Sequence, residues 1–222
     1  MQSKDFTPKT VLFIRHGQTN GNFDGYHQGS EEPLNETGLN QAQLLATRAK
    51  HLEFETIISS DYVRAQQTAQ IIATQTQKPL EISPLFGELR RPSLFNGKKY
   101  DELPEMRQIF DAIDAKSHDA DWHHSDEENF YDVKKRAKRA LELLQNRPEE
   151  TLMVVSHGNF LRGLFGMMLL RQRYSPADYF AISSVMHLMN TGITVVKFAP
   201  SWRFEKPVWQ IVSWNDQMHL GQ

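Results

Sequence analysis

The sequence predicts an α/β protein, a three-layer α/β/α sandwich with a mainly parallel central sheet. Short apolar runs, such as residues 11–14 and 151–156, end abruptly in polar residues, which is typical of strands buried on both faces. Segments with apolar residues at helical spacing separate these runs. Strands that alternate with helices usually form a parallel sheet covered by helices on both faces, and this order predicts the fold class.

The size and composition of the chain indicate one ordinary globular domain. Its 222 residues are enough for a substantial core, and 39% of them are apolar and 23% charged. A formal net charge of -2 argues against a general binder of nucleic acid or acidic membranes. The absence of cysteine excludes disulfides, thiolate catalysis and cysteine-ligated zinc.

No segment of the sequence resembles a signal peptide or a membrane anchor. Residues 1–10 lack the apolar core of a secretory signal. The most apolar later stretch, residues 160–170, is too short to span a bilayer and contains Arg162. We therefore expect a cytoplasmic protein without membrane or nucleic-acid partners, and a homodimer is a candidate assembly.

The first predicted strand, residues 11–14, leads directly into Arg15, His16 and Gly17. The carboxyl ends of strands in open α/β sheets form the ligand crevice, and a glycine there permits a sharp turn. The alternative is a strand that merely ends in polar residues. Residues 18–35, rich in Gly, Asn and other polar residues, are predicted to form a loop.

The next elements alternate between helix and strand. Apolar residues at helical spacing predict a helix over 39–52, with Thr37 as its cap. Residues 54–59 predict the second strand. Ser60 and Asp61 could cap the helix that follows over 62–72, which places Arg64 in its first turn.

The remaining chain continues this alternation after one irregular segment. Residues 79–83 predict a third strand, and residues 90–129, with one short helix near 100–115, predict an excursion over one face. A helix over 130–144, ended by Pro148, precedes the strand at 151–156 and an apolar helix at 160–170. Pro176 begins a further helix, and 193–198 and 208–214 predict the last two strands.

Five polar side chains follow strands of the predicted sheet and should converge on one rim. Arg15 and His16 follow the first strand, and Arg64 follows the second. Glu88 follows the third, and His157 follows the strand at 151–156. Arginines bind a phosphate dianion in bidentate fashion. A neutral imidazole can attack phosphorus, and a carboxylic acid can protonate the leaving oxygen.

These residues lie in motifs that resemble the histidine phosphatase superfamily, in its phosphoglycerate mutase-like branch with the Arg-His-Gly signature. The matching segments are 15–19, 28–29, 33–38, 59–69, 156–158 and 215–220. Several motifs in order are far more specific than the triplet alone. The resemblance covers nearly the whole chain and implies a single histidine phosphatase domain over 1–222, with 90–129 over the active-site face.

The resemblance also implies roles for individual residues. His16 is the expected phosphorylated nucleophile and Glu88 the expected proton donor, with Glu81 and Glu102 as competing carboxylates. The residues expected to hold the phosphoryl group or the substrate are Arg15, Arg64, His157, Asn22, Gly158, Gln28 and Gly29.

The expected function is hydrolysis of small phosphomonoesters by a metal-independent phosphatase, through a phosphohistidine and without a cofactor. The first alternative is cofactor-dependent phosphoryl transfer of the phosphoglycerate mutase type. Residues 157–159, with Leu161 and Arg162, favour it slightly, whereas the surroundings of Glu88 and the irregular middle segment do not match it clearly. The second alternative is a non-catalytic phosphate-binding regulatory module. The presence of both a candidate nucleophile and a candidate acid argues against this module, because a phosphate-binding protein needs neither.

Two weaker patterns each have a simpler interpretation. Residues 118–126 include several His and Asp residues, which are common metal ligands. Their spacing would not bring the side chains to one point, so a solvated loop is the better interpretation. Four basic residues follow Glu88, and they either select substrates with a second negative group or form an ordinary charged surface. These four residues are Arg90, Arg91, Lys98 and Lys99.

Overall fold

The computed structural model describes residues 6–100 and 104–221, and one six-stranded sheet forms its centre. The strands are β1 (Lys9–Arg15), β2 (Thr56–Ser59), β3 (Leu80–Ile82), β4 (Thr151–Ser156), β5 (Ile193–Ser201) and β6 (Phe204–Asp216). Their order is β3-β2-β4-β1-β5-β6. The first four in this order pair in parallel, whereas β5 and β6 are antiparallel additions. The predicted mainly parallel sheet is therefore confirmed.

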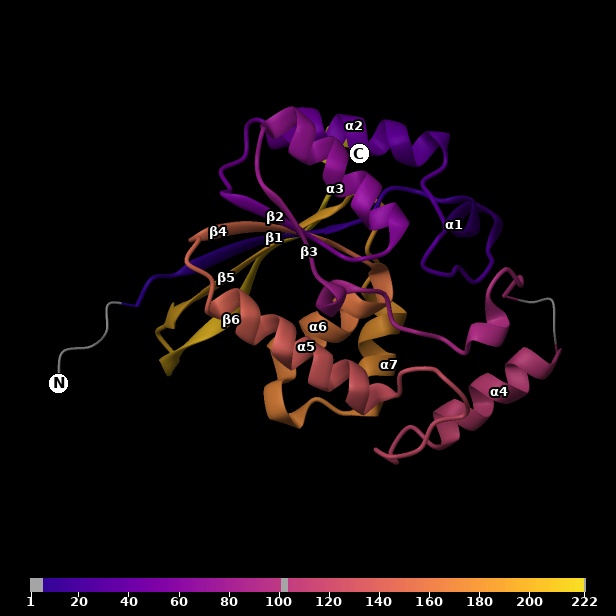
Figure 1. Ribbon diagram of the computed structural model, residues 1–222. Coiled ribbons are helices and arrows are strands. Elements are labelled where there is room, and N and C mark those ends of the chain that lie inside the picture. The colour runs from indigo at the N-terminus through magenta and orange to yellow at the C-terminus, as the bar shows by residue number, and fades with distance from the viewer. Residues whose placement is uncertain (1–5, 101–103, 222) are drawn as a thin grey trace.

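Helices cover both faces of this sheet (Figure 1). The α-helices of the described chain are α1 (Asn20–Asp24), α2 (Glu36–Ala49), α3 (Val63–Thr76), α4 (Pro104–Ala115), α5 (Phe130–Gln145), α6 (Gly158–Leu170) and α7 (Pro176–Val185). Short 3-10 turns span Pro84–Phe86, Ser93–Phe95, Arg171–Arg173 and Met218–Leu220. Helices α2 and α3 lie on one face, and α5 and α6 lie on the other (Figure 1). The three-layer architecture is confirmed.

The alternating side chains of β1 enter two separate cores. Val11 and Phe13 pack in the cluster that contains the buried residues of α5 and α6. Leu12 and Ile14 pack with the buried residues of α2 and α3. Successive side chains of a strand point to opposite faces, so a strand between two helical layers must be apolar throughout.

Three local predictions are wrong. Residues 18–35 are not all loop, because Thr19 and Asn22 form a capping box that begins the short helix α1. Thr37 does not cap α2. The N-cap is Asn35, two residues earlier, and its side-chain oxygen accepts from the Gly38 N–H at 2.8 Å.

The third wrong prediction concerns the start of α3. Tyr62, and not Ser60 or Asp61, is the N-cap residue of α3, and no side chain caps this helix. Ser60 instead accepts a hydrogen bond from the Tyr62 N–H through its Oγ. This hydroxyl is thereby held at the carboxyl end of β2.

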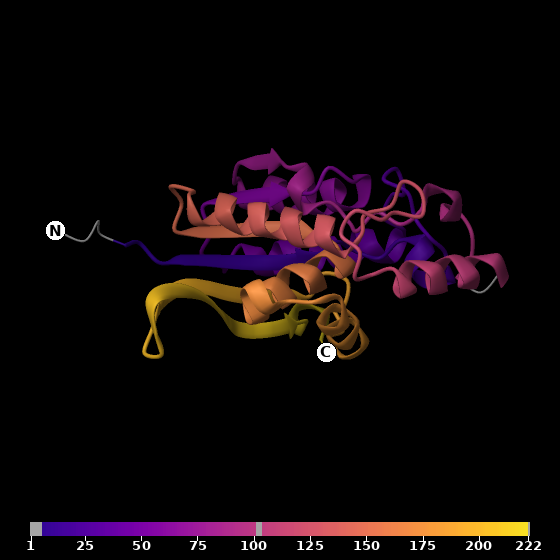
Figure 2. The same cartoon turned by 90° about the horizontal axis from the view of Figure 1, so that it is seen from below.

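Residues 90–129 hold α4, which projects at the opposite end of the molecule from the tip of the β5–β6 hairpin (Figure 2). The two ends of this segment are tied together, since the Glu128 N–H donates to the Arg90 carbonyl at 3.1 Å. An isolated bridge between Tyr26 and Lys99 joins it to the loop after α1. No helix in the described ranges is long and apolar enough to cross a membrane.

Candidate active site

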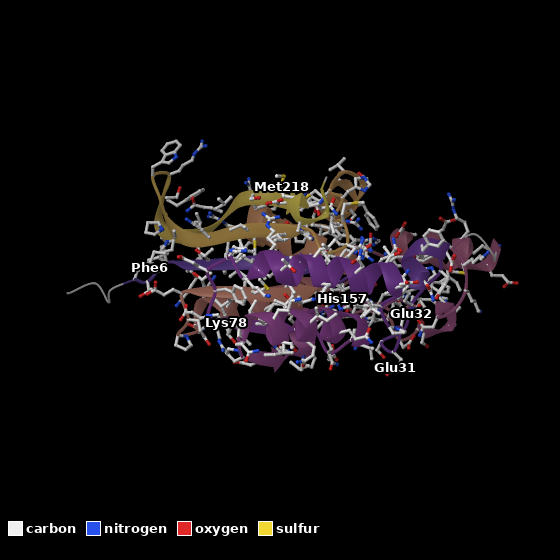
Figure 3. The ribbon with its side chains drawn as sticks, turned by 90° about the horizontal axis from the view of Figure 1, so that it is seen from above. Phe6, Glu31, Glu32, Lys78, His157 and Met218 are labelled. Atoms are coloured by element: carbon white, nitrogen blue, oxygen red, sulfur yellow. The ribbon has the colours of Figure 1, made fainter. Side chains whose placement is uncertain are left out.

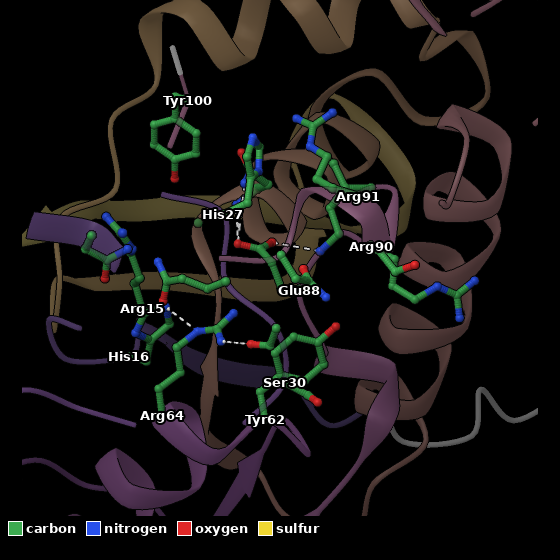
Figure 4. Close-up of a pocket in the computed structure, with 18 of the residues that line it drawn as sticks. Arg15, His16, His27, Ser30, Tyr62, Arg64, Glu88, Arg90, Arg91 and Tyr100 are labelled. Atoms are coloured by element: carbon green, nitrogen blue, oxygen red, sulfur yellow. Dashed lines mark hydrogen bonds between the residues drawn. The ribbon is translucent and has the colours of Figure 1, made fainter. Parts of the chain in front are cut away.

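The polar residues that follow β1, β2 and β4 meet at one edge of the sheet. These strands are parallel, so their carboxyl ends lie together, and the rings of His16 and His157 have centroids 5.0 Å apart. Figure 3 shows His157 and the loop residues Glu31 and Glu32 far from Phe6, which precedes β1. Arg15, His16, Arg64 and Glu88 line a single cavity of about 540 Å³ there (Figure 4).

His16 is buried and its hydrogen bonds define one tautomer. Its Nδ1 lies 2.7 Å from the Gly17 carbonyl oxygen, and since a carbonyl only accepts, Nδ1 must hold the ring proton. The Nε2 lone pair accepts from Arg64 Nε at 3.2 Å. Burial, and then the charges of Arg64 and Arg15, hold the pKa of His16 well below its usual value of 6.5. The imidazole is therefore neutral at neutral pH, with Nε2 as its basic atom.

Two arginines from different elements, Arg15 of β1 and Arg64 of α3, flank this imidazole. Arg64 lies in the first turn of α3, and its Nη1 donates to the Gly29 carbonyl at 2.8 Å. Arg15 donates through Nη1 to the Leu188 carbonyl at 2.7 Å, while its buried Nε has no hydrogen-bond partner in the described part of the chain. Burial lowers the pKa of Arg15 to about 10, so it stays charged at neutral pH. An anion is the natural partner for its Nε–H.

Gly158 preserves the space beside Arg15. A Cβ at this position would lie 3.5 Å from Arg15 Nε, which is ordinary contact distance but would occupy part of the opening. Gly158 is also the first residue of α6, and helix N-termini favour anions.

His157 immediately precedes α6 and is fully buried. Its Nε2 lies 2.7 Å from Ser60 Oγ, and its buried Nδ1 has no partner among the residues that the structure describes. Burial, together with the charge of Arg64, lowers its pKa well below 6.5. Ser60 Oγ can donate to His157 Nε2 or accept from it. When it donates, Nδ1 holds the ring proton and can donate to a ligand.

Glu88 follows the 3-10 turn Pro84–Phe86, and its carboxylate lies against the first turn of α6. Its Oε1 accepts from the backbone N–H groups of Leu89 and Phe160 at 2.8 and 2.9 Å. Its Oε2 accepts two long contacts from Asn159, from the backbone N–H at 3.4 Å and from Nδ2 at 3.5 Å. One oxygen is thus held by backbone, and the other is left for a ligand in the cavity.

The competing carboxylates do not share this position. Glu81 forms an exposed ion pair with Arg147 at 2.6 Å and does not line the cavity. Glu102 lies outside the described residues.

The expected auxiliary residues Asn22, Gln28 and Gly29 also line the cavity. The side-chain oxygens of Asn22 and Gln28 and the Gly29 carbonyl accept hydrogen bonds within the protein. Asn22 Oδ1 accepts from Asn190 Nδ2 at 3.2 Å, and the same nitrogen donates to the His16 carbonyl at 2.8 Å. Gln28 Oε1 accepts from the Thr19 hydroxyl at 2.7 Å. These residues shape the loop around His16.

Sequence reasoning missed several residues of the cavity wall. Tyr62 packs edge-on against His157 at 5.0 Å, with the Arg64 guanidinium 4.9 Å from its ring centroid. His27 lies among aromatic rings, and burial, then the charge of Arg91, lower its pKa to about 4. No periodic pattern marks these loop residues. Arg162, four residues after Gly158 on the same helical face, could have been found by its spacing.

The basic segment divides between the two interpretations that the sequence left open. Arg90 and Arg91 line the cavity, whereas Lys98 and Lys99 are not among its described lining residues. In the loop of residues 118–126, His123 Nε2 lies 2.6 Å from Asp132 Oδ2. No group of three metal-ligand side chains within the described ranges could hold an ion.

Comparisons with known proteins place the chain in one family. The family model of the histidine phosphatase superfamily (branch 1) matches residues 11–217. The chain is 29% identical to phosphoglycerate mutase-like protein 4 of Arabidopsis thaliana, over 99% of this chain and 90% of that protein. It is 31% identical to the adenosylcobalamin/alpha-ribazole phosphatase of Escherichia coli K12, over 76% of this chain and 81% of that one.

A solved structure extends the similarity to the whole fold. A mutant phosphoserine phosphatase from Entamoeba histolytica, in complex with phosphoserine, superposes with a TM-score of 0.72 and 28% identity. The match covers 96% of this chain and 99% of that one.

Proposed function

The chain belongs to the histidine phosphatase superfamily, branch 1, and we propose that it hydrolyses small phosphomonoesters through a phosphohistidine, without a metal. The main support is the state of His16, a buried neutral imidazole whose Nε2 accepts from Arg64 in a cavity that Arg15 also lines. An imidazole in this state is a nucleophile at neutral pH. The arginines supply the positive charge that a transferring phosphoryl group requires.

In the first step, the phosphate binds among Arg15 Nε, Arg64 and His157 Nδ1. Arg64 Nε exchanges its hydrogen bond to His16 for one to a phosphate oxygen, which frees Nε2. Nε2 then attacks phosphorus and the bond to the leaving oxygen breaks, while protonated Glu88 gives its proton to that oxygen.

In the second step, Glu88 acts as a carboxylate. It removes a proton from a water molecule that attacks phosphohistidine, the bond between phosphorus and Nε2 breaks, and inorganic phosphate leaves. His16 is neutral again and Glu88 is protonated for the next cycle.

The charges around the cavity favour a substrate with a second negative group. Five arginines line the described cavity wall against two carboxylates, Glu88 and Asp126, and two arginines already suffice for one phosphate. The other three are Arg90, Arg91 and Arg162. A phosphorylated carboxylate or a bisphosphate would bring charge to this outer wall, and phosphoserine, bound by the solved relative, is such a compound.

A mutase is the second candidate, favoured by the name of the phosphoglycerate mutase-like relative. It would use the same phosphohistidine but return the phosphoryl group to a substrate oxygen instead of water. Either activity would belong to one domain over residues 1–222, in which residues 90–129 form an excursion over the active-site face.

Phosphate release from a panel of phosphomonoesters tests this proposal. The panel includes 3-phosphoglycerate, phosphoserine and a bisphosphate, all in excess chelator, with His16→Ala as the control. Release by the parent and not by the variant supports the phosphatase. Isomerisation of phosphoglycerate without release supports the mutase. Neither activity, together with phosphate binding, would favour the non-catalytic module.

A further inference from the structure

Glu88 lies on a turn whose backbone carbonyls are bound by side chains from other elements. Arg136 of α5 donates through Nη1 to the carbonyls of Gly87 at 2.7 Å and Leu85 at 3.2 Å. Its Nη2 donates to the carbonyl of Glu88 itself at 3.2 Å. Buried carbonyls outside a sheet need such partners, and one guanidinium supplies three of them here.

Arg136 is itself held in place by Glu128. Its Nε and Nη2 donate to the two oxygens of Glu128, each at 2.7 Å. The side chains are only 15% and 7% exposed. The guanidinium also stacks 4.2 Å from the ring centroid of Phe160, whose backbone N–H binds the Glu88 carboxylate.

Glu128 also binds the chain on the far side of Glu88. The backbone N–H of Arg90 donates to Glu128 Oε2 at 3.1 Å, and the Glu128 N–H donates to the Arg90 carbonyl at 3.1 Å. The Arg136–Glu128 pair therefore fixes the chain before, at and after Glu88.

We propose that Arg136 and Glu128 are positioning residues for proton transfer by Glu88, an inference that rests on the proposed phosphatase function. A general acid must lie within hydrogen-bond reach of the leaving oxygen, and misplacement by about 1 Å can cost roughly 100-fold in rate. The turn has no regular secondary structure after Phe86 to fix it. The ion pair between Arg136 and Glu128 holds the turn in place of regular secondary structure.

General energetics also favour positioning over stabilisation. A buried ion pair is often no more stabilising than apolar residues of the same volume, because both charges lose their hydration. The geometric precision of a planar guanidinium bound to a carboxylate is harder to replace. Apolar packing here would also leave the carbonyls of Leu85, Gly87 and Glu88 without donors. The ion pair supplies those donors and fixes them in one place.

Arg136→Met tests the inference with two substrates that differ in their leaving group. Glycerol phosphate has a poor leaving group and needs protonation, whereas p-nitrophenyl phosphate does not. We expect kcat/KM to fall roughly 10- to 100-fold for glycerol phosphate and only a few-fold for p-nitrophenyl phosphate. In the Glu88→Gln background the same change should add little. Equal losses for both substrates, or none, would overturn the proposal.

The matched control is Arg48→Met. Arg48 forms a similar bidentate pair with Asp216, between α2 and β6, and makes none of the contacts of the Glu88 turn. It should lower stability without changing the ratio between the two substrates. Glu128→Gln, which keeps the shape of the carboxylate, is the milder variant if Arg136→Met does not fold, and it should shift the ratio in the same direction.

Amide hydrogen exchange supplies a readout that does not depend on turnover. The Leu89 and Phe160 amides are bound by Glu88 Oε1, so Arg136→Met should accelerate their exchange while the amides of β1 stay protected. Unchanged protection would contradict the positioning role even if no substrate of the panel reacted. A parent enzyme without activity would contradict the proposed function alone.

Discussion

At the scale of single residues, Arg91 is the strongest candidate for selecting substrates by charge. Its guanidinium lies 5.4 Å from the centroid of the Phe110 ring and makes no hydrogen bond within the described chain, although it lines the cavity. A cation packed on an aromatic face keeps its N–H groups available to a ligand. If the site binds a second anionic group of the substrate, Arg91 is therefore a better candidate to contact it than Lys98 or Lys99.

We predict that Arg91→Gln discriminates between substrates by charge. A hydrogen bond between charged groups contributes about 1.5–3 kcal/mol, so kcat/KM for 3-phosphoglycerate should fall about tenfold or more. For p-nitrophenyl phosphate, whose leaving group lacks a second anion, it should change less than about threefold. Steady-state kinetics measure both, with Lys98→Gln as the control from the same basic segment. Equal effects on the two substrates would exclude a second-anion site at Arg91.

The sequence could predict which residues meet at the site but not where each one points. Arg15, His16, Arg64 and His157 converge because they follow parallel strands, whose ends are fixed by the hydrophobic pattern. Arg91 and Lys98 occur in one irregular segment, and there the direction of a side chain depends on tertiary contacts such as that with Phe110. Charge alone gives no direction, which is why both interpretations stayed open.

At the scale of secondary structure, the contact between the His16 loop and the start of α2 controls the site. A Cβ on Gly38 would lie 2.0 Å from the Gln18 carbonyl oxygen, and one on Gly17 would lie 2.6 Å from the Gly38 carbonyl oxygen. Both neighbours are backbone, so neither can move by changing a rotamer. The two glycines bring helix and loop together at the turn that positions the nucleophile.

We therefore predict that Gly38→Ala disturbs both stability and activity. Overpacking costs about 1–3 kcal/mol in unfolding free energy, and the displaced loop should lower kcat by at least about tenfold. The matched control is Thr37→Ala at the adjacent exposed position, where we expect a change within about 0.5 kcal/mol and normal activity. Urea unfolding and phosphate release measure the two effects. Normal activity in Gly38→Ala would contradict the prediction, because it would mean that displacement of the His16 loop does not affect catalysis.

Element types followed from the sequence more readily than their ends did. The long segments with period 3.6 are helices because an apolar stripe must face the sheet. Asn35 and Thr37 are both good capping residues, but Asn35 also binds Gln18 through its backbone N–H and its side chain, contacts that the sequence does not reveal. Helix α1 has too few residues for a periodic stripe, so its capping box was its only signal.

At the scale of the whole molecule, buried histidines should make the fold sensitive to acid. Burial lowers the pKa of His16 and His157 well below 6.5 and that of His27 and His219 to about 4. An unfolded chain would protonate these residues near 6.5. Between about pH 6.5 and 4 the unfolded state therefore binds more protons than the folded state.

The sign of this difference gives a prediction for the intact protein. The unfolding free energy should be highest above pH 6.5 and should fall as the pH drops toward 4. The fall is at most about 1.4 kcal/mol per pH unit for each excess proton, and it is smaller for the half-buried His27 and His219, whose charge solvent screens. Urea titrations at pH 7.5, 6 and 5 measure this slope, and His219→Gln should make it shallower because one lowered pKa is removed. The pair between His123 and Asp132 acts in the opposite direction, since its hydrogen bond raises the pKa of His123, but that ring is exposed and its contribution is weaker. A stability that stays constant from pH 7.5 to 5 would mean that the buried histidines take up protons without unfolding, and the neutral state assigned to His16 would then fail with it.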